Sequence, residues 1–323
     1  MVNLEPAGVE PVRSTRRRWI AGGAAGLGLA GLGAYIYSRA PGFWRQFIRE
    51  ARRPIAAPPQ VPQPHRWPDT GLHAAWLGHT TVLLKVEGHW ILTDPVFSSR
   101  AGIYLGVGTL GVKRLVEPAL PPEQLPPMDL LLLSHAHMDH MDLPSLRRLE
   151  NRRTAVVLAR HTSDLIRTER YRQVREVGWG ERVQVGPAGI EAFEVNHWGA
   201  RLRSDTYRGY SGFVLQIGRW RILFGGDTGD TPVFRRLKVS KPYHLAIMPI
   251  GAYNPWRRRH CTPEEAWRMA NEAGADLFLP VHHQTFILSR EPIMEPIERL
   301  FEAAGNQASR IVIRAIGQEC HLS

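Results

Sequence analysis

Three histidines and two aspartates are packed into eight residues, "HAHMDHMD", which start at His135. They follow four consecutive leucines, residues 130–133, which have the length and apolarity of a buried strand. Imidazole and carboxylate groups are costly to bury unless they share a partner, and a divalent cation is such a partner. In an extended segment His135 and His137 point to the same side, whereas Asp139 and His140 come after the strand has ended. The spacing therefore indicates two pairs of ligands, and so two metal ions rather than one.

Several other short apolar runs also end in a histidine or an aspartate. Each has strand length and is rich in Val, Ile, Leu or Phe, and if these strand ends share one edge of the fold, their side chains converge. Among them, His197, Asp227 and His282 are the available ligands for completing two metal sites. Asp227 is the natural bridge, because each of its carboxylate oxygens can reach a different ion. A ligand set rich in imidazole with some carboxylate suits zinc, and iron accepts the same ligand types.

The surrounding elements predict an α/β fold. The early strands come as hairpins, and the later strands alternate with helical segments. Helices are expected at residues 143–150, 163–169, 263–273 and 295–304. Asp142 is expected to cap the first of these helices. Together the elements predict two β-sheets faced by helices, with the loops gathered along one edge, in a domain that spans residues 71–323.

A wider set of motifs carries a family resemblance. H-x-H-x-D-H after an apolar strand is the signature of the metallo-β-lactamase superfamily, which the chain resembles in "SHAHMDHMD". The chain also resembles N-acylphosphatidylethanolamine-hydrolysing phospholipase D and its bacterial relatives in a series of motifs, which come in the same order and with closely similar residues. These motifs are "WLGHTTVLL", "ILTDPVFSSRA", "FGGDTGDTPVF", "MPIGAY" and "VHHQTF". The resemblance covers residues 76 to about 286. It implies a four-layer αββα sandwich of two mixed β-sheets flanked by helices.

The resemblance also implies a set of metal ligands. The first ion would be held by His135, His137 and His197, the second by Asp139, His140 and His282, with Asp227 between the two. His282 rather than His283 matches the family ligand, because Thr285-Phe286 sets the frame of that motif.

Three further roles beside the metals are implied by the same resemblance. Asp139 would be a ligand first and a proton acceptor second. His260 matches a family histidine that donates a hydrogen bond to a phosphoryl oxygen or a proton to the leaving group. Asp94 matches an aspartate that orients a ligand histidine, and a turn-forming role before Pro95 is the alternative. His79 either acts in the same way as Asp94 or simply ends its strand.

The implied function is that of a zinc-dependent hydrolase with two Zn²⁺ per domain. It would be a phosphodiesterase of phospholipase D type, in which a hydroxide held between the metals attacks the phosphorus of N-acylphosphatidylethanolamine or a related glycerophospholipid. Another hydrolase on the same fold (a lactonase, a β-lactamase or a nuclease) is the first alternative, because a fold does not fix chemistry. A di-iron redox protein is the second, although such sites usually carry a carboxylate where His137 stands. A non-catalytic protein is disfavoured, since every ligand position is filled. Residues 199–213, unusually rich in arginine, are expected to shape the substrate groove.

The N-terminal residues 1–53 have a different character. They hold nine arginines against three glutamates, in a chain whose net charge is +11, and residues 19–37 carry no charge at all. The motif "STRRRWI" resembles a twin-arginine export signal. We interpret residues 1–53 as such a signal or as a membrane anchor, with a basic amphipathic segment behind it. Residues 54–70, with six prolines, are expected to form a linker.

These features predict where the protein works and with what. A membrane-associated protein is expected, anchored in an inner membrane or exported to the periplasm, with the cytoplasmic face as the alternative. The expected partners are a phospholipid substrate and a membrane surface. Nucleic acid is not an expected partner, because the charge outside residues 1–53 is diffuse and no nucleic-acid-binding motif stands out.

Overall fold

The computed structural model describes residue 38 and residues 41–323, and the chain divides into two compact units, Met1–Arg53 and Pro54–Ser323. In the first unit the described part is mainly the helix α2 (Pro41–Ala51), where Trp44 and Phe47 meet edge to face with ring centroids 5.8 Å apart. The twin-arginine-like motif and the uncharged stretch 19–37 lie outside the described residues. Within the described part of the chain, no helix has both the length and the apolarity that crossing a membrane requires.

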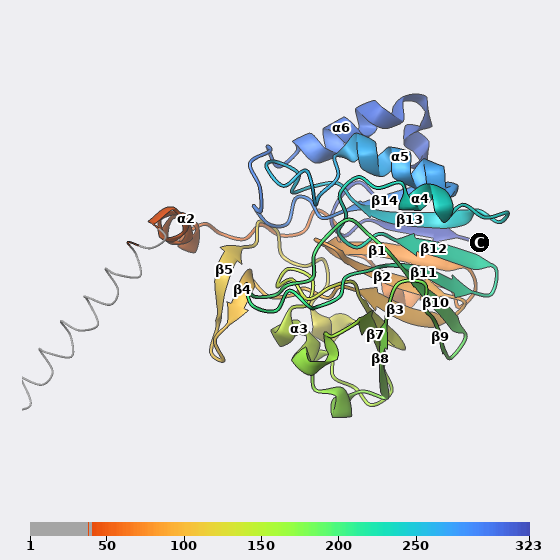
Figure 1. The fold of residues 1–323 in the computed structure, drawn as a ribbon, viewed down its shortest axis with the longest axis horizontal. Coiled ribbons are helices and arrows are strands. Elements are labelled where there is room, and N and C mark those ends of the chain that lie inside the picture. Colours follow the sequence, from red (N-terminus) through yellow and green to blue (C-terminus); the bar gives the residue numbers. More distant parts are fainter. Residues whose placement is uncertain (1–37, 39–40) are drawn as a thin grey trace, which may run out of the picture. The chain divides into compact units, whose positions relative to one another are not determined.

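Two large β-sheets form the centre of the second unit (Figure 1). The first has seven strands in the order β15-β1-β2-β3-β6-β7-β8, and the second has six in the order β14-β13-β12-β11-β10-β9. Both sheets are mixed: β3, β6, β7 and β8 run parallel in the first, as do β12, β13 and β14 in the second, and the other neighbours are antiparallel. The strands of the first sheet are β1 (Leu72–Gly78), β2 (Thr81–Val86), β3 (His89–Thr93), β6 (Leu130–Leu133), β7 (Ala155–Ala159), β8 (Gln173–Val177) and β15 (Glu319–Leu322). Those of the second are β9 (Arg182–Val185), β10 (Ala188–Phe193), β11 (Gly212–Ile217), β12 (Trp220–Phe224), β13 (Tyr243–Pro249) and β14 (Ala275–Val281).

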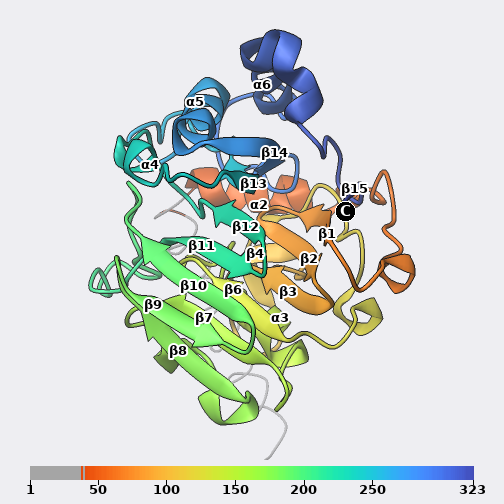
Figure 2. The same ribbon diagram turned by 90° about the vertical axis from the view of Figure 1, so that its right-hand side faces the viewer.

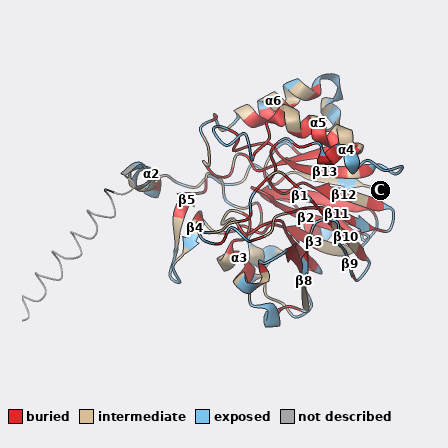
Figure 3. Ribbon diagram, in the orientation of Figure 1, coloured by how far each residue is buried: buried red, intermediate tan, exposed pale blue. Residues whose placement is uncertain are grey.

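The main hydrophobic core joins the two sheets. Trp76 and Leu131 from the first sheet and Phe224 and Ile247 from the second belong to the same buried cluster. The parallel strands β6 and β7 are buried along their full length, as is usual for parallel strands that are covered on both faces. Figure 3 shows the same distribution, with buried residues along the sheets and exposed residues on the outer sides of the helices.

Helices complete the layers (Figures 1 and 2). On the second sheet, α5 (Pro263–Ala273) packs against β13 and β14, and α6 (Glu295–Ala304) and the short α4 (Val233–Arg236) pack against α5. On the side of the first sheet, α3 (Leu143–Arg148) contributes Leu146 to the main core. The predicted α/β sandwich of two mixed sheets flanked by helices is confirmed.

Two of the predicted helices match the structure residue for residue. The helix predicted at 263–273 begins with a capping box, in which the Thr262 hydroxyl accepts the backbone N–H of Glu265 and the Glu265 carboxylate accepts that of Thr262. It ends at Gly274, whose φ of 80° lies in the left-handed region. The helix at 295–304 has the predicted bounds as well. Such local signals fix helix ends well because they depend only on neighbouring residues.

The helix predicted at residues 163–169 is wrong. These residues form two separate 3₁₀ turns, Ser163–Leu165 and Thr168–Arg170. At the start of this segment the chain is bonded to β8, where the Glu176 carboxylate accepts the backbone N–H groups of His161, Thr162 and Ser163. The backbone is extended at Ile166 (ψ 162°), and this separates the two turns.

The proline-rich residues 54–70, predicted as a linker, belong to the second unit instead. Ala56 forms a parallel bridge with Val116. The Trp67 side chain is buried, and its indole N–H donates to Glu319 Oε2 at 3.0 Å. Lys85 Nζ donates to the Trp67 carbonyl at 2.8 Å. The prolines supply extended backbone as expected, but Trp67 anchors that backbone to the sheet, so the folded unit begins before residue 71.

Candidate metal centre

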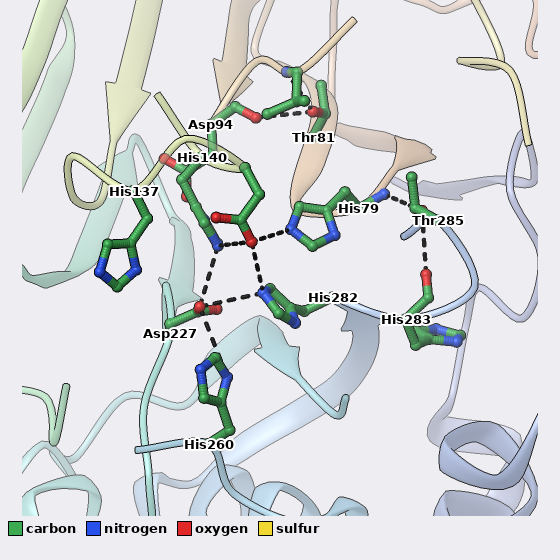
Figure 4. A network of polar contacts seen from close by, with 12 residues as sticks. His79, Thr81, Asp94, His137, His140, Asp227, His260, His282, His283 and Thr285 are labelled. Atoms are coloured by element: carbon green, nitrogen blue, oxygen red, sulfur yellow. Dashed lines mark hydrogen bonds and ion pairs between the residues drawn. The ribbon is translucent and has the colours of Figure 1, made fainter. Parts of the chain in front are cut away.

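The strand topology brings the ends of several strands to one edge of the sandwich. In the first sheet β1 runs in the same direction as β3 and β6, and in the second sheet β10 runs in the same direction as β12 and β14. The segments that follow these strands carry His79, Asp94, His135, His197, Asp227 and His282. Figure 4 shows residues from both sheets meeting around Asp227. The predicted convergence of the strand ends is therefore a feature of the fold.

One group of side chains comprises His135, His137, His197 and Asp227. One ligand atom from each lies within 4.8 Å of the others. His137 Nδ1 lies 2.9 Å from His135 Nε2 and 3.2 Å from His197 Nε2. Asp227 Oδ2 lies 3.7 Å from His197 Nε2 and 4.0 Å from His135 Nε2. Three imidazoles from two sheets and one carboxylate thus surround a single small volume.

A second group comprises His79, Asp139, His140 and His282, again with ligand atoms within 4.8 Å of one another. Asp139 Oδ2 lies 3.1 Å from His79 Nε2, 3.6 Å from His140 Nε2 and 3.5 Å from His282 Nε2. Asp227 Oδ2 also reaches this group, at 3.1 Å from His140 Nε2 and 3.2 Å from His282 Nε2. Asp227 therefore stands between the two groups, the position predicted for a bridging carboxylate.

The chemistry of these atoms fits divalent cations. His140 Nε2, His282 Nε2 and Asp227 Oδ1 are buried and make no hydrogen bond with any described residue. Burial opposes a positive charge on His282, but the carboxylates of Asp227 and Asp139 outweigh it and raise the pKa of His282 to about 9. Burial would raise the pKa of Asp227, but the neighbouring histidines, His140 first, hold it well below its usual range. The buried Asp227 carboxylate and the partly exposed Asp139 carboxylate beside it require positive charge, and bound metal would supply it in place of protons.

Asp94 lies behind the second group and is fully buried. Its Oδ2 accepts from His140 Nδ1 at 2.8 Å and from Ser134 Oγ at 2.5 Å, while its Oδ1 accepts the Ser134 backbone N–H at 2.7 Å. This carboxylate fixes the His140 ring so that Nε2 faces Asp227. The contacts match the orienting role expected for Asp94, and one Asp94 oxygen also lies within 4.8 Å of ligand atoms of His135 and His140.

His260, in the segment before α5, faces Asp227, with its Nδ1 3.8 Å from Asp227 Oδ2. His283 points elsewhere: its ring stacks on Trp76 with centroids 4.5 Å apart. The structure thus places His282, and not His283, in the cluster. Asp142 is the helix cap that was predicted, since its side chain accepts the Ser145 backbone N–H.

The backbone is unusual where the cluster is built. His79, Asp94 and His282 have φ angles of 51°, 30° and 64°, in the left-handed region that non-glycine residues rarely adopt. Such conformations cost on the order of 1–3 kcal/mol each and are retained where the surroundings require them. At Gly226 (φ 56°) an added Cβ would lie 2.9 Å from Ser134 Cβ. Glycine there lets the ends of β12 and β6 approach each other beside Asp227.

Sequence reasoning missed the role of Arg201. This side chain, expected to shape a substrate groove, donates instead to the carbonyls of Ala136 at 3.0 Å and Met141 at 2.8 Å. It therefore holds the loop that carries His137 and Asp139. No local signal marks this role, because its partners are backbone atoms about sixty residues away.

Comparisons with known proteins place this geometry in a family. The family model of the Beta-lactamase superfamily domain matches residues 89–283. The chain is 31% identical over 285 residues to an uncharacterized protein of Mycobacterium tuberculosis, covering 85% of this chain and 76% of that protein. It is 32% identical over 252 residues to N-acyl-phosphatidylethanolamine-hydrolyzing phospholipase D 1 of Caenorhabditis elegans, covering 72% and 70%. The chain therefore belongs to the metallo-β-lactamase superfamily, and its His and Asp clusters are able to bind metal.

Solved structures share the fold at low sequence identity. An isothiocyanate hydrolase from Delia radicum gut bacteria superposes with a TM-score of 0.62 at 19% identity, covering 78% of this chain and 99% of that one. CmlA, a diiron β-hydroxylase from Streptomyces venezuelae, gives 0.58 at 19% identity, covering 79% and 55%. Since one fold carries both hydrolytic and redox chemistry, these likenesses concern the fold alone.

Proposed function

We propose that this chain is a zinc-dependent phosphodiesterase of phospholipase D type that hydrolyses N-acylphosphatidylethanolamine or a related glycerophospholipid. The observation that carries the proposal is the pair of buried His/Asp groups that share Asp227, in a chain similar over 252 residues to a phospholipase D of that substrate. In this proposal two Zn²⁺ are held by the seven predicted ligands, His135, His137, Asp139, His140, His197, Asp227 and His282.

When bound, two zinc ions would supply Lewis acidity and a nucleophile drawn from water at neutral pH. The protein's own contribution is positional. Asp94 holds His140 in one orientation, and Arg201 holds the loop that carries Asp139. His260 lies beside Asp227 on the side opposite to His79 (Figure 4), where it would donate a hydrogen bond to a phosphoryl oxygen or a proton to the leaving alkoxide. The products would be phosphatidic acid and the freed head group.

A direct test uses the purified full-length chain with its metal content measured on the same sample. Release of phosphatidic acid from N-acylphosphatidylethanolamine in mixed micelles is the expected result. His137→Ala should lose metal and activity together, whereas His65→Ala, an exposed histidine in the 3₁₀ turn Pro64–Arg66, should keep both. Full zinc occupancy without turnover of this lipid or any other phosphodiester would refute the proposal.

The same purified samples distinguish the alternative functions. Turnover of a lactone, a β-lactam or a nucleic acid, with phospholipids untouched, would establish another hydrolase on this fold. Stoichiometric iron with oxygen-dependent redox activity would establish a di-iron protein.

We further propose a membrane surface as the site of action and an inner-membrane or periplasmic location. Fractionation of cells that express the chain tests this location, with the cytoplasmic face as the alternative outcome.

A further inference from the structure

The hairpin formed by β4 (Arg100–Tyr104) and β5 (Thr109–Lys113) is separate from both large sheets. Within the described part of the chain its two strands pair only with each other, and Figure 1 shows the hairpin beside the sandwich rather than within it. Gly102 and Gly111 face each other across the ladder, where an added Cβ on either would clash with the opposite backbone. The two strands are thus held close together and form a narrow arm.

The tip of this arm is apolar and exposed. Ile103 is 47% exposed, Leu105 63% and Val107 fully exposed at 101%. Among the described residues, and apart from the immediate chain neighbours, no atom lies within 4 Å of a Cβ built at Gly106 or Gly108, so the space beside these two glycines is open. Water-exposed aliphatic side chains gathered at the end of a projecting arm are unfavourable unless something else covers them.

Positive charge flanks the apolar tip. The segment 95–116 contains no aspartate or glutamate. Arg100 and Lys113 face each other at the base of the hairpin, and the exposed Arg147, at the end of α3, lies over the Tyr104 ring with 5.1 Å between its guanidinium carbon and the ring centroid. An exposed apolar tip beside the Arg147 cation and the Tyr104 ring complements an anionic lipid interface, where aliphatic side chains enter the acyl region and a cation meets a phosphate.

The size of the tip argues for a bilayer rather than a protein partner. A stable protein interface buries roughly 800 Å² on each side, and a tip of three aliphatic side chains offers far less. A membrane needs no matching surface, because each inserted side chain contributes on its own.

The base of the arm connects it to the metal centre. Ala101, near that base, packs in a small cluster with Val96 and Phe286, against which Val112 also packs. The Phe286 ring meets the His79 ring edge to face, with centroids 5.2 Å apart. One side chain therefore separates the packing at the base of the hairpin from the second group of ligands.

We propose that residues 103–110 insert into the surface of an anionic phospholipid bilayer and so bring the metal centre to its lipid. The contact with lipid rests on the structure of the hairpin, and its purpose rests on the function proposed above. It is a membrane contact of the catalytic unit itself, additional to any made by residues 1–53.

The test uses the full-length chain with Val107→Cys carrying an environment-sensitive fluorophore. The matched control is Val239→Cys, which is 49% exposed in the loop between α4 and β13. The wild-type chain carried through the same labelling gives the background from Cys261 and Cys320. With phosphatidylglycerol/phosphatidylcholine vesicles we expect a blue shift at position 107 and none at 239, and a smaller shift with phosphatidylcholine alone. No shift at 107, equal shifts at both positions, or a shift at 107 without lipid would overturn the proposal.

A second measurement links the contact to catalysis. Replacing Leu105 and Val107 together by Asp should lower turnover of phospholipid in anionic vesicles by about ten-fold or more, with turnover of a monomeric short-chain phosphodiester unchanged; Val239→Asp should lower neither. Equal loss on both substrates would overturn the proposal. Because the fluorescence experiment needs no turnover, it decides the lipid contact even if the chain hydrolyses no phospholipid.

Discussion

Asp94→Asn should weaken one metal site more than the other. Asp94 Oδ2 receives two hydrogen bonds, from His140 Nδ1 and Ser134 Oγ, and an amide nitrogen in that place cannot accept either. A hydrogen bond to a charged group contributes about 1.5–3 kcal/mol. Loss of a partner that orients a ligand histidine typically costs 10–100-fold in metal affinity, which is about 1.4–2.7 kcal/mol at 1.36 kcal/mol per ten-fold. Both estimates give a similar loss of binding free energy for the ion held by His140.

Asparagine is the informative replacement because it adopts the left-handed backbone readily. Asp94 has φ 30° and precedes Pro95, so a purely turn-forming residue would tolerate asparagine at little cost. Titration with a competing chelator should show one ion released 10–100-fold more easily. The control is Asp129→Asn, directly before the neighbouring strand β6, where the carboxylate accepts the backbone N–H of Trp90 in β3 at 2.8 Å. If Asp94→Asn and the control both retain wild-type affinity for two ions, the orienting role is refuted.

Three further predictions concern stability. Removing metal with a chelator should lower the thermal unfolding midpoint by at least about 5 °C, because the neighbouring carboxylates of Asp139 and Asp227 lose their cations, and added zinc should restore it; calorimetry that finds no change would contradict this. Thr262→Ala removes half of the capping box of α5 and should cost about 1 kcal/mol in urea unfolding, whereas an unchanged midpoint would show that the cap is dispensable. Burial would raise the pKa of the Glu176 carboxyl, but the hydrogen bonds that this carboxylate accepts, the one from Ser163 first, hold the pKa below its usual value. The ionised Glu176 side chain therefore stabilises the fold above about pH 4.5, and this stabilisation is lost as the pH falls. Urea midpoints of wild type and Glu176→Gln should accordingly converge between pH 6 and pH 3, and a constant gap would contradict the sign.

Helix ends and strand ends were predictable where the signals are local. The capping box at Thr262, the cap at Asp142 and the apolar run of β6 all act on residues within a few positions. The failed helix at residues 163–169 shows the limit, since the chain there forms two 3₁₀ turns and is bonded at its start by Glu176 from a later strand. The same limit explains the supposed linker, which Trp67 attaches to the sheet through Glu319, a partner 252 residues away.

The chemical groups of the site can be read from the sequence. The spacing of His135, His137, Asp139 and His140 indicates two pairs of ligands, because a strand and the turn after it point their side chains in different directions. The family resemblance names His197, Asp227 and His282 as the distant partners, and the folded structure is what brings them to the two pairs. Asp227 lies between the two groups of ligands, and His283 lies outside them. Each position follows from the direction of the preceding strand and from the conformation of the residues directly after it. The supporting contacts of Asp94 and Arg201, and the apolar arm that ends at Val107, likewise depend on the packing of segments that a single stretch of sequence cannot specify.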